Sequence, residues 1–398
     1  MQGVNHAGRR ARKAACPLFA LVLLAWLPAA TVAAQPLRIG TSGDYAPFST
    51  VDANGARQGF DIELATRLAR DLGRQPTFVA FRWPELSEAL VAGRFDVACS
   101  GVTIRPERQL AGRFTRPYVS SGATALVRKT DRPLYASAAD LDRDSVRIVV
   151  NRGGHLEAVT RARFPRARID AVDDNTSLPA RVLRGDADAL VTDTIEARPL
   201  LAAADALVAL PPFTWDRKAL LIRRNQLQLH AAVDRWLAER EADGWLNQLR
   251  RQWLGADAEI SVPRARIEAV VALVDQRLRL MPLVAAAKRR RGRAVEDRAR
   301  EQEVLAGARA MSVQAGLDAD RVAALFAALI DAAKMVQRSA PAVEPTADLD
   351  QLRLLLGDIG ERLVTEVASA RVILADPQHR AELEEGVGRI DAPGLDAS

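Results

Sequence analysis

Short apolar runs alternate with helical patterns through the first part of the chain, between Leu37 and roughly Leu254. The runs are rich in β-branched residues and predict buried strands, whereas segments 60–72 and 83–91 carry apolar residues at helical spacing. Strands are predicted at 37–40, 77–80, 96–99, 146–150 and 187–191. Because strands that alternate with helices usually pair in parallel, this pattern indicates an α/β fold with largely parallel sheets.

Beyond Pro263 the strand patterns disappear, and the chain becomes rich in Ala, Leu and Arg. Apolar residues there recur at three- and four-residue spacing, as in amphipathic helices. Asp376 and Pro377 supply an N-cap and a first-turn proline for a short last helix. We therefore predict an all-helical domain at 264–398 after a linker at 257–263. Its long helices are expected at 264–287, 297–315, 318–338 and 348–374.

Two cations of this helical segment lie among apolar positions. Arg277 and Lys288 are eleven residues apart, which is about three turns of one helix, so they are predicted to share a face. Val270, Val274 and Leu278 surround Arg277 at core spacing. A cation in such a place is costly to bury unless an anion meets it. The helical domain is therefore predicted to enclose a small polyanion.

The first 34 residues have the layout of a secretory signal peptide. Four basic residues precede an apolar run at 18–32, and small residues at 32–34 form a cleavage site. An uncleaved anchor is the alternative, but the run falls short of the roughly 20 residues that a membrane span needs. We expect cleavage after Ala34 and a periplasmic or secreted protein with no stable membrane association.

Removing this leader changes the charge balance. It holds four basic and no acidic residues, so its removal reduces the formal net charge from +6 to +2. A charge this small gives little reason to expect a nucleic-acid partner. Cys99 is then the sole cysteine, which excludes an intramolecular disulfide. The chain must rely on its hydrophobic core, and a chain of this length can supply one.

Three motifs in the first part resemble the polar-amino-acid family of periplasmic solute-binding proteins. They are Gly43-Asp44-Tyr45-Ala46-Pro47-Phe48, Gly59-Phe60-Asp61-Ile62-Glu63-Leu64-Ala65, and Ser100-Gly101-Val102-Thr103 with Pro106-Glu107-Arg108. The resemblance implies a domain at 35–256 with two α/β lobes that close on a ligand. Lobe one would be 36–128 plus 226–256, and lobe two would be 129–225.

Members of this family hold their ligand with charged and polar side chains in the cleft. By the resemblance, Arg108 would clamp a ligand carboxylate in a bidentate fork, with help from the hydroxyls of Ser100 and Thr103. Asp193 would meet an α-amine, and Asp44 would be a further ligand contact. The alternative for Arg108, if the surrounding motif is disregarded, is a surface arginine that follows a loop.

Other segments resemble the cyclohexadienyl dehydratases, which are enzymes on the binding-protein scaffold. They are Trp83-Pro84-Glu85-Leu86, Asn151-Arg152-Gly153-Gly154, Thr192-Asp193-Thr194-Ile195-Glu196-Ala197-Arg198, Ala242-Asp243-Gly244 and Trp253-Leu254. By this resemblance Trp83 contacts the substrate. His155 stands where the family typically has a threonine. It could be an additional cation, a second acid or a tolerated substitution.

Glu196 distinguishes an enzyme from a receptor. An amino-acid receptor needs Asp193 but not a second carboxylate three residues later. Eliminating the ring hydroxyl of prephenate requires a proton donor, and paired carboxylates in a water-poor cleft push one pKa upward. Glu196 and Asp193 are therefore predicted to be catalytic, with Glu196 as the acid. The alternative for Glu196 is a glutamate at a helix N-terminus, favoured by the helix dipole.

The helical segment resembles the all-helical chorismate mutases, in particular their secreted subclass. The resemblance covers about 264–371 and rests on segments 273–278, 282–288 and 295–302, on Gly316-Leu317-Asp318 and Gly360-Glu361-Arg362-Leu363, and on Phe326, Ile330 and Gln337. Chorismate carries two carboxylates and rearranges in a pericyclic step without general acid, nucleophile or metal. Holding its compact conformer and stabilising negative charge on the breaking ether oxygen accelerate that step.

The resemblance also implies how the substrate is held. Arg277 and Arg362 would bind the carboxylates, and Lys288 would reach the ether oxygen and a carboxylate. Gln337 would donate to the ether oxygen from the opposite side.

Three further residues would position the ring hydroxyl, namely Arg300 with Asp297 or Glu301. Asp297 could instead be only a helix N-cap, and Arg300 with Glu301 could be a solvated ion pair. The basic cluster at 289–293 is either a solvated loop or a patch that steers anionic substrate.

Together these features indicate a multidomain protein in which a two-lobed α/β periplasmic-binding-protein-like domain precedes an all-α chorismate mutase domain. The second domain would convert chorismate to prephenate, and the first would convert prephenate or arogenate to phenylpyruvate or phenylalanine. No metal or organic cofactor is expected, and assembly into a homo-oligomer is compatible with the sequence. Two alternatives stay open: an amino-acid receptor fused to a mutase, and an interaction protein whose helices form a docking bundle.

Overall fold

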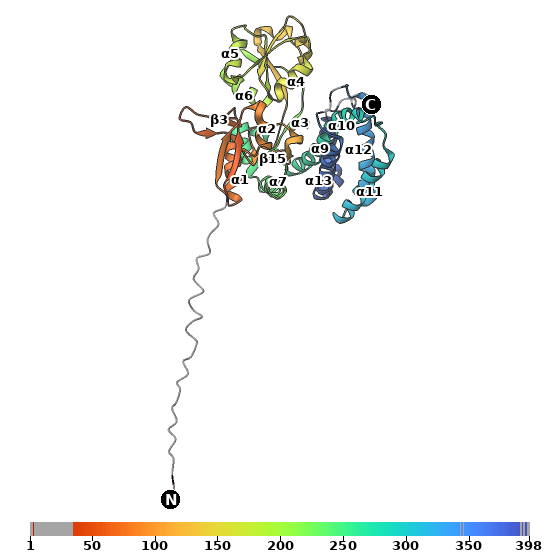
Figure 1. The fold of residues 1–398 in the computed structure, drawn as a ribbon. Coiled ribbons are helices and arrows are strands. Elements are labelled where there is room, and N and C mark those ends of the chain that lie inside the picture. The colour runs from red at the N-terminus through yellow and green to blue at the C-terminus, as the bar shows by residue number, and fades with distance from the viewer. Residues whose placement is uncertain are drawn as a thin grey trace. The chain divides into compact units, whose positions relative to one another are not determined.

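Two lobes of mixed α/β structure form the first part of the protein (Figure 1). The computed structural model describes residue 3 and residues 35–342, 344, 346–390, 392 and 395. The first lobe contains a five-stranded sheet in the order β5-β1-β6-β15-β7. Its strands are β1 (Leu37–Thr41), β5 (Pro76–Ala80), β6 (Val97–Ala98), β7 (Gly112–Phe114) and β15 (Leu221–Arg223). β1 runs parallel to β5 and β6, whereas β15 runs antiparallel to β6 and β7.

Helix α1 (Phe60–Asp71) shows how the helices of this lobe join the core. Phe60, Leu64 and Leu68 recur every four residues, are fully buried, and share one apolar cluster with Leu37 and Ile39 of β1. The other elements are η1 (Trp83–Glu85), α2 (Leu86–Val91), α3 (Pro106–Ala111), α7 (Leu227–Ala242) and α8 (Trp245–Leu254), with a small sheet of β2 (Asp44–Tyr45), β3 (Ser49–Val51) and β4 (Arg57–Gln58).

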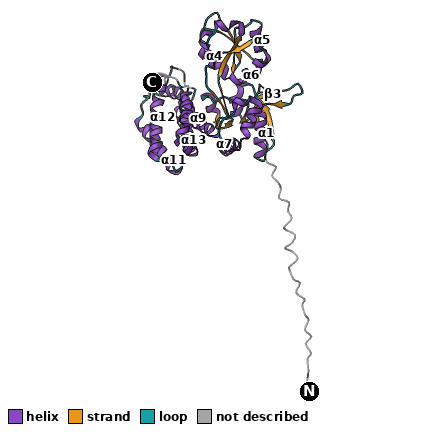
Figure 2. Cartoon of the chain, turned by 180° about the vertical axis from the view of Figure 1, so that it is seen from behind, coloured by secondary structure: helices purple, strands orange, loops and turns teal. Residues whose placement is uncertain are grey.

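The second lobe contains a five-stranded sheet in the order β11-β10-β12-β9-β13. Its strands are β9 (Ala123–Arg128), β10 (Arg147–Asn151), β11 (Arg168–Val172), β12 (Ala189–Asp193) and β13 (Leu207–Ala209). Figure 2 shows this sheet among α4 (His155–Arg163), α5 (Leu178–Leu183) and α6 (Thr194–Ala203). A two-stranded pair is formed by β8 (Val119–Ser121) and β14 (Asp216–Lys218). The short helices are η2 (Lys129–Leu134), η3 (Ala138–Leu141) and η4 (Asn175–Ser177).

The predicted α/β fold is confirmed, and all five predicted strands overlap strands of the structure. The expected lobe boundaries are wrong in two places. Strand β9, expected in lobe one, pairs antiparallel with β12 and β13 of the second sheet. Strand β15, expected in lobe two, pairs antiparallel with β6 and β7 of the first sheet. The chain therefore enters the second lobe before β9 and returns to the first lobe before β15. The strand pattern in the sequence does not show where these crossings occur.

The remainder of the chain is helical, as predicted. It contains η5 (Ala256–Ala258), α9 (Val262–Arg279), α10 (Met281–Arg290), α11 (Arg298–Gln314), α12 (Ala319–Ser339), α13 (Leu349–Ala375), η6 (Pro377–His379) and α14 (Arg380–Gly388). Helix α9 packs along α13, and α11 packs along α12 (Figure 1). Phe326, Leu352 and Leu363 lie in the buried core between them. We call residues 36–258 the two-lobed region and residues 262–390 the helical region.

The single helix expected at 264–287 is divided into α9 and α10 at Leu280. Pro282 occupies the first turn of α10, and because proline lacks a backbone N–H it cannot continue the hydrogen-bond pattern of α9. Arg277 and Lys288 therefore lie on different helices. The prediction that three turns of one helix place them on one face is wrong, although the fold still brings both side chains to one cavity.

Ion pairs fasten the helical region to the first lobe. Asp358, Arg362 and Glu366 lie one turn apart on α13, so they form a polar stripe along one side of that helix. Asp358 pairs with Arg113 at 2.9 Å, and Glu366 pairs with Arg116 at 2.8 Å. Residues 36–398 pack as one compact unit. The separation of the chain into independent domains at 257–263 stays a prediction.

The predicted leader at 1–34 and its cleavage site lie outside the described residues, except for residue 3. Among the helices that the structure describes, none is both long enough and apolar enough to cross a membrane.

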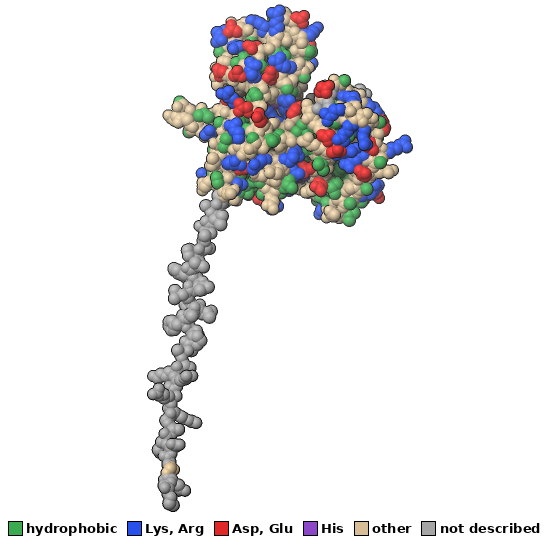
Figure 3. Space-filling view, viewed as in Figure 1, with side chains coloured by type: hydrophobic (Ala, Val, Ile, Leu, Met, Phe, Trp, Pro, Cys, Tyr) green, Lys and Arg blue, Asp and Glu red, His purple; other side chains and the backbone are tan. Residues whose placement is uncertain are grey.

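Charges are mixed on the molecular face shown in Figure 3, where basic and acidic side chains lie side by side. In the basic cluster at 289–293, Arg291 pairs with Asp348 at 2.7 Å and with Asp350 at 3.0 Å. This arginine helps to fix the start of α13, so the cluster is not simply a solvated loop.

Candidate active sites

A narrow cleft between the two lobes gathers polar and aromatic side chains, and we call it the interlobe cleft. It is lined by Tyr45, Trp83, Gly101, Thr103, Arg108, Asn151, Gly154, His155, Leu156, Asn175, Glu196 and Lys218. The cavity measures about 30 Å³, which is room for about one water molecule. The lobes are therefore closed on each other, and a ring-sized substrate requires them to separate.

Arg108 lies in the cleft as the resemblance implied, and it is 6% exposed. Its Nη1 donates to the Thr103 carbonyl at 2.9 Å, and its guanidinium lies over the Trp83 ring. Burial, helped by repulsion from Arg105, lowers the pKa of Arg108 to about 9. Within the described chain no carboxylate pairs with Arg108, so the guanidinium is available to a ligand carboxylate.

Glu196 lies at the first turn of α6 and is 7% exposed. Its Oε1 accepts a hydrogen bond from Asn175 Nδ2 at 2.7 Å, and its Oε2 is bonded to the Thr192 hydroxyl. Burial raises the pKa of Glu196 to about 7, with a smaller contribution from the negative charge of Asp193. Glu196 is therefore suited to carry a proton near neutral pH, as a general acid must.

Asp193 already has a cationic partner inside the protein. Lys218 Nζ lies 2.9 Å from Asp193 Oδ2 and 2.9 Å from Thr103 Oγ1, and both side chains of the ion pair are almost fully buried. Ser121 Oγ donates to the same Asp193 oxygen, and Asp193 Oδ1 caps α6 by accepting from the Ile195 N–H. The carboxylate that would meet the amine of an amino-acid ligand is therefore occupied by an internal ammonium group.

His155 lines the cleft, and its Nε2 lies 2.7 Å from Asp216 Oδ1. Burial lowers the pKa of His155 although Asp216 opposes this, which favours a neutral imidazole at pH 7. Of the three roles considered for His155, an additional cation is the least compatible with this environment.

Three residues predicted for this site do not line the cleft, and the first is Asp193, which is fully buried behind Lys218. Ser100 is fully buried and its hydroxyl bonds to the Ser42 hydroxyl at 2.8 Å. Asp44 is exposed, and its backbone carbonyl accepts from Asn175.

Sequence reasoning missed Lys218 and Asn175. Lys218 could have been found from its place directly before the apolar run 219–222. Arg277 was selected by the same rule, that a cation among apolar residues is costly to bury without an anion.

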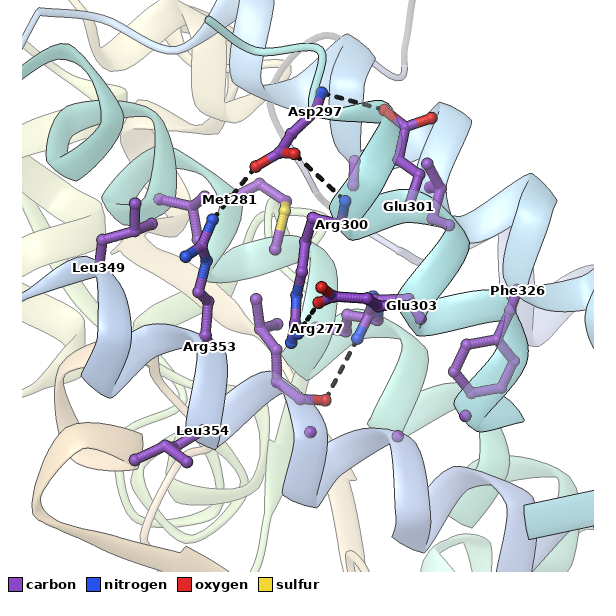
Figure 4. Close-up of a pocket in the computed structure, with 18 of the residues that line it drawn as sticks. Arg277, Met281, Asp297, Arg300, Glu301, Glu303, Phe326, Leu349, Arg353 and Leu354 are labelled. Atoms are coloured by element: carbon purple, nitrogen blue, oxygen red, sulfur yellow. Dashed lines mark hydrogen bonds and ion pairs between the residues drawn. The ribbon is translucent and has the colours of Figure 1, made fainter. Parts of the chain in front are cut away.

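A larger cavity lies within the helical region, and we call it the helical cavity (Figure 4). Its volume is about 550 Å³, which is in the range of small-molecule sites. Its charged and amide side chains are Arg113, Arg277, Lys288, Asp297, Arg300, Glu301, Glu303, Lys334, Gln337, Arg353, Asp358 and Glu361. All the predicted mutase residues except Arg362 are among them. Phe326 and Met281 contribute apolar walls.

Four of the six basic side chains in this cavity are paired with carboxylates. The pairs are Arg353–Asp297 at 3.2 Å, Arg300–Glu303 at 2.8 Å, Lys334–Glu301 at 3.3 Å and Arg113–Asp358 at 2.9 Å. Dashed lines in Figure 4 mark the first two pairs. Among the described residues, no carboxylate lies within 4.0 Å of Arg277 or Lys288. Arg277 and Lys288 are therefore the two cations of the cavity that have no paired carboxylate, which suits them to an anionic ligand.

Backbone carbonyls hold these two cations in place. Arg277 Nη1 donates to the Leu356 carbonyl at 3.2 Å, and Lys288 Nζ donates to the Val295 carbonyl at 2.6 Å. Burial lowers the pKa of Arg277 to about 10, with repulsion from Arg300 in the same direction. Burial also lowers the pKa of Lys288. Both shifts report positive charge held in poorly solvated surroundings, which a bound carboxylate would relieve.

Gln337 is buried, and its hydrogen-bonding capacity is largely unused. Its Nε2 lies 3.5 Å from the Met281 thioether sulfur, which is a weak acceptor. In the described structure, Gln337 Oε1 has no hydrogen-bond partner. A buried amide without strong partners is costly, so this side chain is suited to a ligand that completes its hydrogen bonds.

Asp297, Arg300 and Glu301 occupy the start of α11 at the cavity wall. Asp297 is an N-cap, since it accepts from the Arg300 N–H at 3.2 Å, and it is also the partner of Arg353. The alternative in which Arg300 and Glu301 form a solvated ion pair is wrong, because Arg300 pairs with Glu303 and Glu301 pairs with Lys334.

Arg362 does not line the helical cavity. Its Nη2 donates to the Phe114 carbonyl of the first lobe at 2.7 Å. Arg353, nine residues earlier on α13, lines the cavity. Nine residues are two and a half turns, so the two arginines lie on opposite sides of the helix. The geometry does not support a substrate-binding role for Arg362, and Arg353 is the arginine of α13 that reaches the site.

Comparison with known proteins agrees with both regions. Residues 37–256 match bacterial extracellular solute-binding proteins, family 3, and residues 268–338 match chorismate mutase type II. Cyclohexadienyl dehydratase of Pseudomonas aeruginosa is 35% identical over 249 residues, which cover 59% of this chain and 92% of that protein. The L-cystine-binding protein TcyJ of Escherichia coli K12 is 30% identical over 223 residues, which cover 56% of this chain and 83% of that protein.

The solved structures similar to this chain include an ancestral amino-acid-binding protein, AncCDT-1, described as a precursor of cyclohexadienyl dehydratase. It is 36% identical, covers 55% of this chain and 95% of its own, and superposes with a TM-score of 0.52. The relatives thus include both binding proteins and an enzyme, all of which share the two-lobed region. The chain belongs to the family 3 bacterial extracellular solute-binding proteins, and its helical region contains a type II chorismate mutase domain.

Proposed function

We propose that this protein is an exported bifunctional enzyme. The helical region isomerises chorismate to prephenate, and the two-lobed region converts prephenate to phenylpyruvate. Arogenate would be converted to phenylalanine in the same cleft. The observation that carries the assignment of the two-lobed region is that Asp193 is occupied by Lys218, whereas Glu196 has a pKa of about 7 and can give up a proton. A receptor for free amino acids needs Asp193 unpaired, so that it can bind the ligand amine, and it needs no acid at Glu196.

In the interlobe cleft, Arg108 holds a carboxylate of prephenate in a bidentate fork. The bond between the ring and its carboxyl carbon breaks, and carbon dioxide leaves. The electron pair moves through the ring and expels the ring hydroxyl, which takes a proton from Glu196 and departs as water. The ring becomes aromatic. Closure of the lobes excludes bulk water, which strengthens the interaction of Arg108 with the carboxylate.

In the helical cavity, Arg277 and Lys288 hold the two carboxylates of chorismate in the compact conformer. Lys288 and Gln337 stabilise the negative charge that develops on the ether oxygen as its bond to carbon breaks. The new carbon–carbon bond forms in the same step, so no proton is transferred. Arg353 and Arg300, each paired with a carboxylate, lie in the same cavity.

Incubation of the mature protein with chorismate, followed by mass spectrometry of the products over time, tests this function. We expect transient prephenate and then phenylpyruvate. Prephenate that accumulates without further conversion would support a binding protein fused to a mutase. Unchanged chorismate would instead support a helical region that serves as a docking bundle.

Replacing Lys218 with methionine should change the preference of the cleft between prephenate and arogenate. The variant leaves Asp193 without its ammonium partner, so the amine of arogenate can take that place. We expect the ratio of kcat/KM for prephenate to that for arogenate to fall about tenfold or more, which corresponds to one hydrogen bond to a charged group. The measurement is steady-state turnover of both substrates.

The matched control for this substitution is Ser121→Ala, which removes another hydrogen bond to Asp193 but keeps the ion pair. This variant should retain the wild-type preference. An unchanged ratio in Lys218→Met would mean that Asp193 does not face the substrate amine.

A further inference from the structure

One wall of the helical cavity comes from the two-lobed region. Arg113 belongs to β7, which is an edge strand of the first sheet, and its side chain lines the cavity together with Asp358 of α13. The two side chains form an ion pair of 2.9 Å. They are 20% and 13% exposed, so the pair lies at the boundary between the cavity and the interface.

This ion pair has unused hydrogen-bonding capacity. Arg113 Nε and Asp358 Oδ2 are both buried and have no hydrogen-bond partner among the described residues. Burial lowers the pKa of Arg224, and the positive charge of Arg113 nearby lowers it further. The negative charge of Asp358 acts in the opposite direction. Among the described residues Asp358 pairs with Arg113 alone, whereas Arg224 donates to the Gly112 carbonyl at 3.0 Å.

The neighbouring contacts show that Arg113 is not simply one more docking residue. Arg116 pairs with Glu366 and with Asp234 at 3.0 Å, and it does not line the cavity. The Phe114 carbonyl accepts from Arg362, which also lies outside the cavity. Of these interface groups from the first lobe, Arg113 is the one that reaches the cavity.

We propose that Arg113 is a substrate-binding residue of the mutase site, so that this site is complete only when both regions are present. The inference rests on the mutase function proposed above. Arg113 would contact a carboxylate of the dianionic substrate from the cavity wall, as a third cation beside Arg277 and Lys288. Arg108 of the interlobe cleft lies five residues earlier in the chain. One short segment, α3 with β7, therefore carries anion-binding groups for both sites.

Steady-state kinetics of chorismate turnover by full-length variants test this proposal. Arg113→Met should raise KM for chorismate about tenfold or more, as expected for a lost hydrogen bond between charged groups. Arg113→Lys should recover part of this loss. Asp358→Asn should lower KM, because Arg113 keeps its charge and loses its competitor. Arg116→Met, which removes an interface pair away from the cavity, should retain the wild-type KM.

Comparing Arg113→Met with Asp358→Asn distinguishes substrate binding by Arg113 from docking of the two regions. If Arg113 only fastens the two regions together, Arg113→Met and Asp358→Asn must impair turnover alike, and that result would overturn the proposal. A wild-type KM in a folded Arg113→Met would also overturn it. Prephenate dehydration by the same variant reports whether the two-lobed region is folded. Wild-type protein that leaves chorismate unchanged would contradict the mutase function itself, which is a different outcome from either of these.

Discussion

Replacing Glu196 with glutamine is expected to lower prephenate dehydration by about 10²-fold or more, which is the typical contribution of a general acid. Glutamine fits the same hydrogen bonds, because its carbonyl can accept from Asn175 and its amide can donate to the Thr192 hydroxyl. The substitution therefore removes the acidic proton and little else. Product formation from prephenate is the measurement, and chorismate turnover in the same protein is the internal control.

The pH dependence of dehydration gives a second test of Glu196. Its pKa is about 7, and the active form is the protonated acid, so turnover should be constant below that pH and fall about tenfold per unit above it. The Thr192 hydroxyl bond lowers the pKa of Glu196, so Thr192→Val should move this decline to higher pH while keeping activity at low pH. Near-wild-type dehydration by Glu196→Gln would return Glu196 to a structural role and favour a receptor.

Replacing Gln337 with alanine is expected to reduce chorismate turnover by about 10²–10³-fold, if its amide acts as other oxyanion donors do. The loss should appear mainly in kcat, because negative charge on the ether oxygen develops only in the transition state. Met281→Leu removes the thioether beside the amide and conserves the volume, so it should retain most of the activity. Full activity in Gln337→Ala would show that this side chain does not face the ether oxygen.

The pH profile of the mutase follows from the same residue. An amide carries its donor protons at every pH, and the pKa of Arg277 is about 10, so turnover should be nearly constant between about pH 5 and 8. A decline at the alkaline end would be assigned to Lys288, whose pKa is lowered by burial. Gln337→Glu should introduce an acidic optimum, because a glutamate can donate to the ether oxygen only while it is protonated. An unchanged profile in Gln337→Glu would contradict this geometry.

The narrow interlobe cleft and the larger helical cavity differ in what their proposed reactions require. Loss of carbon dioxide and water proceeds through charges that bulk water would screen, and the closed lobes exclude it. The rearrangement of chorismate transfers no proton, and a preformed cationic cavity of about 550 Å³ is sufficient for it.

Local patterns in the sequence predicted the fold class and several side chains that line the two candidate sites. Arg277 and Lys288 stood out because a cation among apolar positions has few structural explanations, and both line the helical cavity. The same rule, applied to 352–356, would have selected Arg353, which interrupts a run of leucines. Glu196 followed from its spacing to Asp193, and its environment in the cleft agrees with the expected acid.

Tertiary structure decided which side of each element faces a site. Arg362 matched a family motif, but its side of α13 faces the Phe114 carbonyl of the first lobe. The helix predicted at 264–287 is divided at Leu280, so the shared face of Arg277 and Lys288 is a property of the fold and not of one helix.

Contacts between distant segments could not be read from the chain. Lys218 meets Asp193 because β14 and β12 approach each other in space, and Arg113 enters the helical cavity because an edge strand docks on α13. The sequence by itself determined the α/β and helical regions and the cations of α9 and α10, since these depend on spacing within one segment. Only packing decided which charges are neutralised and which stay free for a substrate. An ion pair depends on the distance between two side chains, whatever their separation in the sequence.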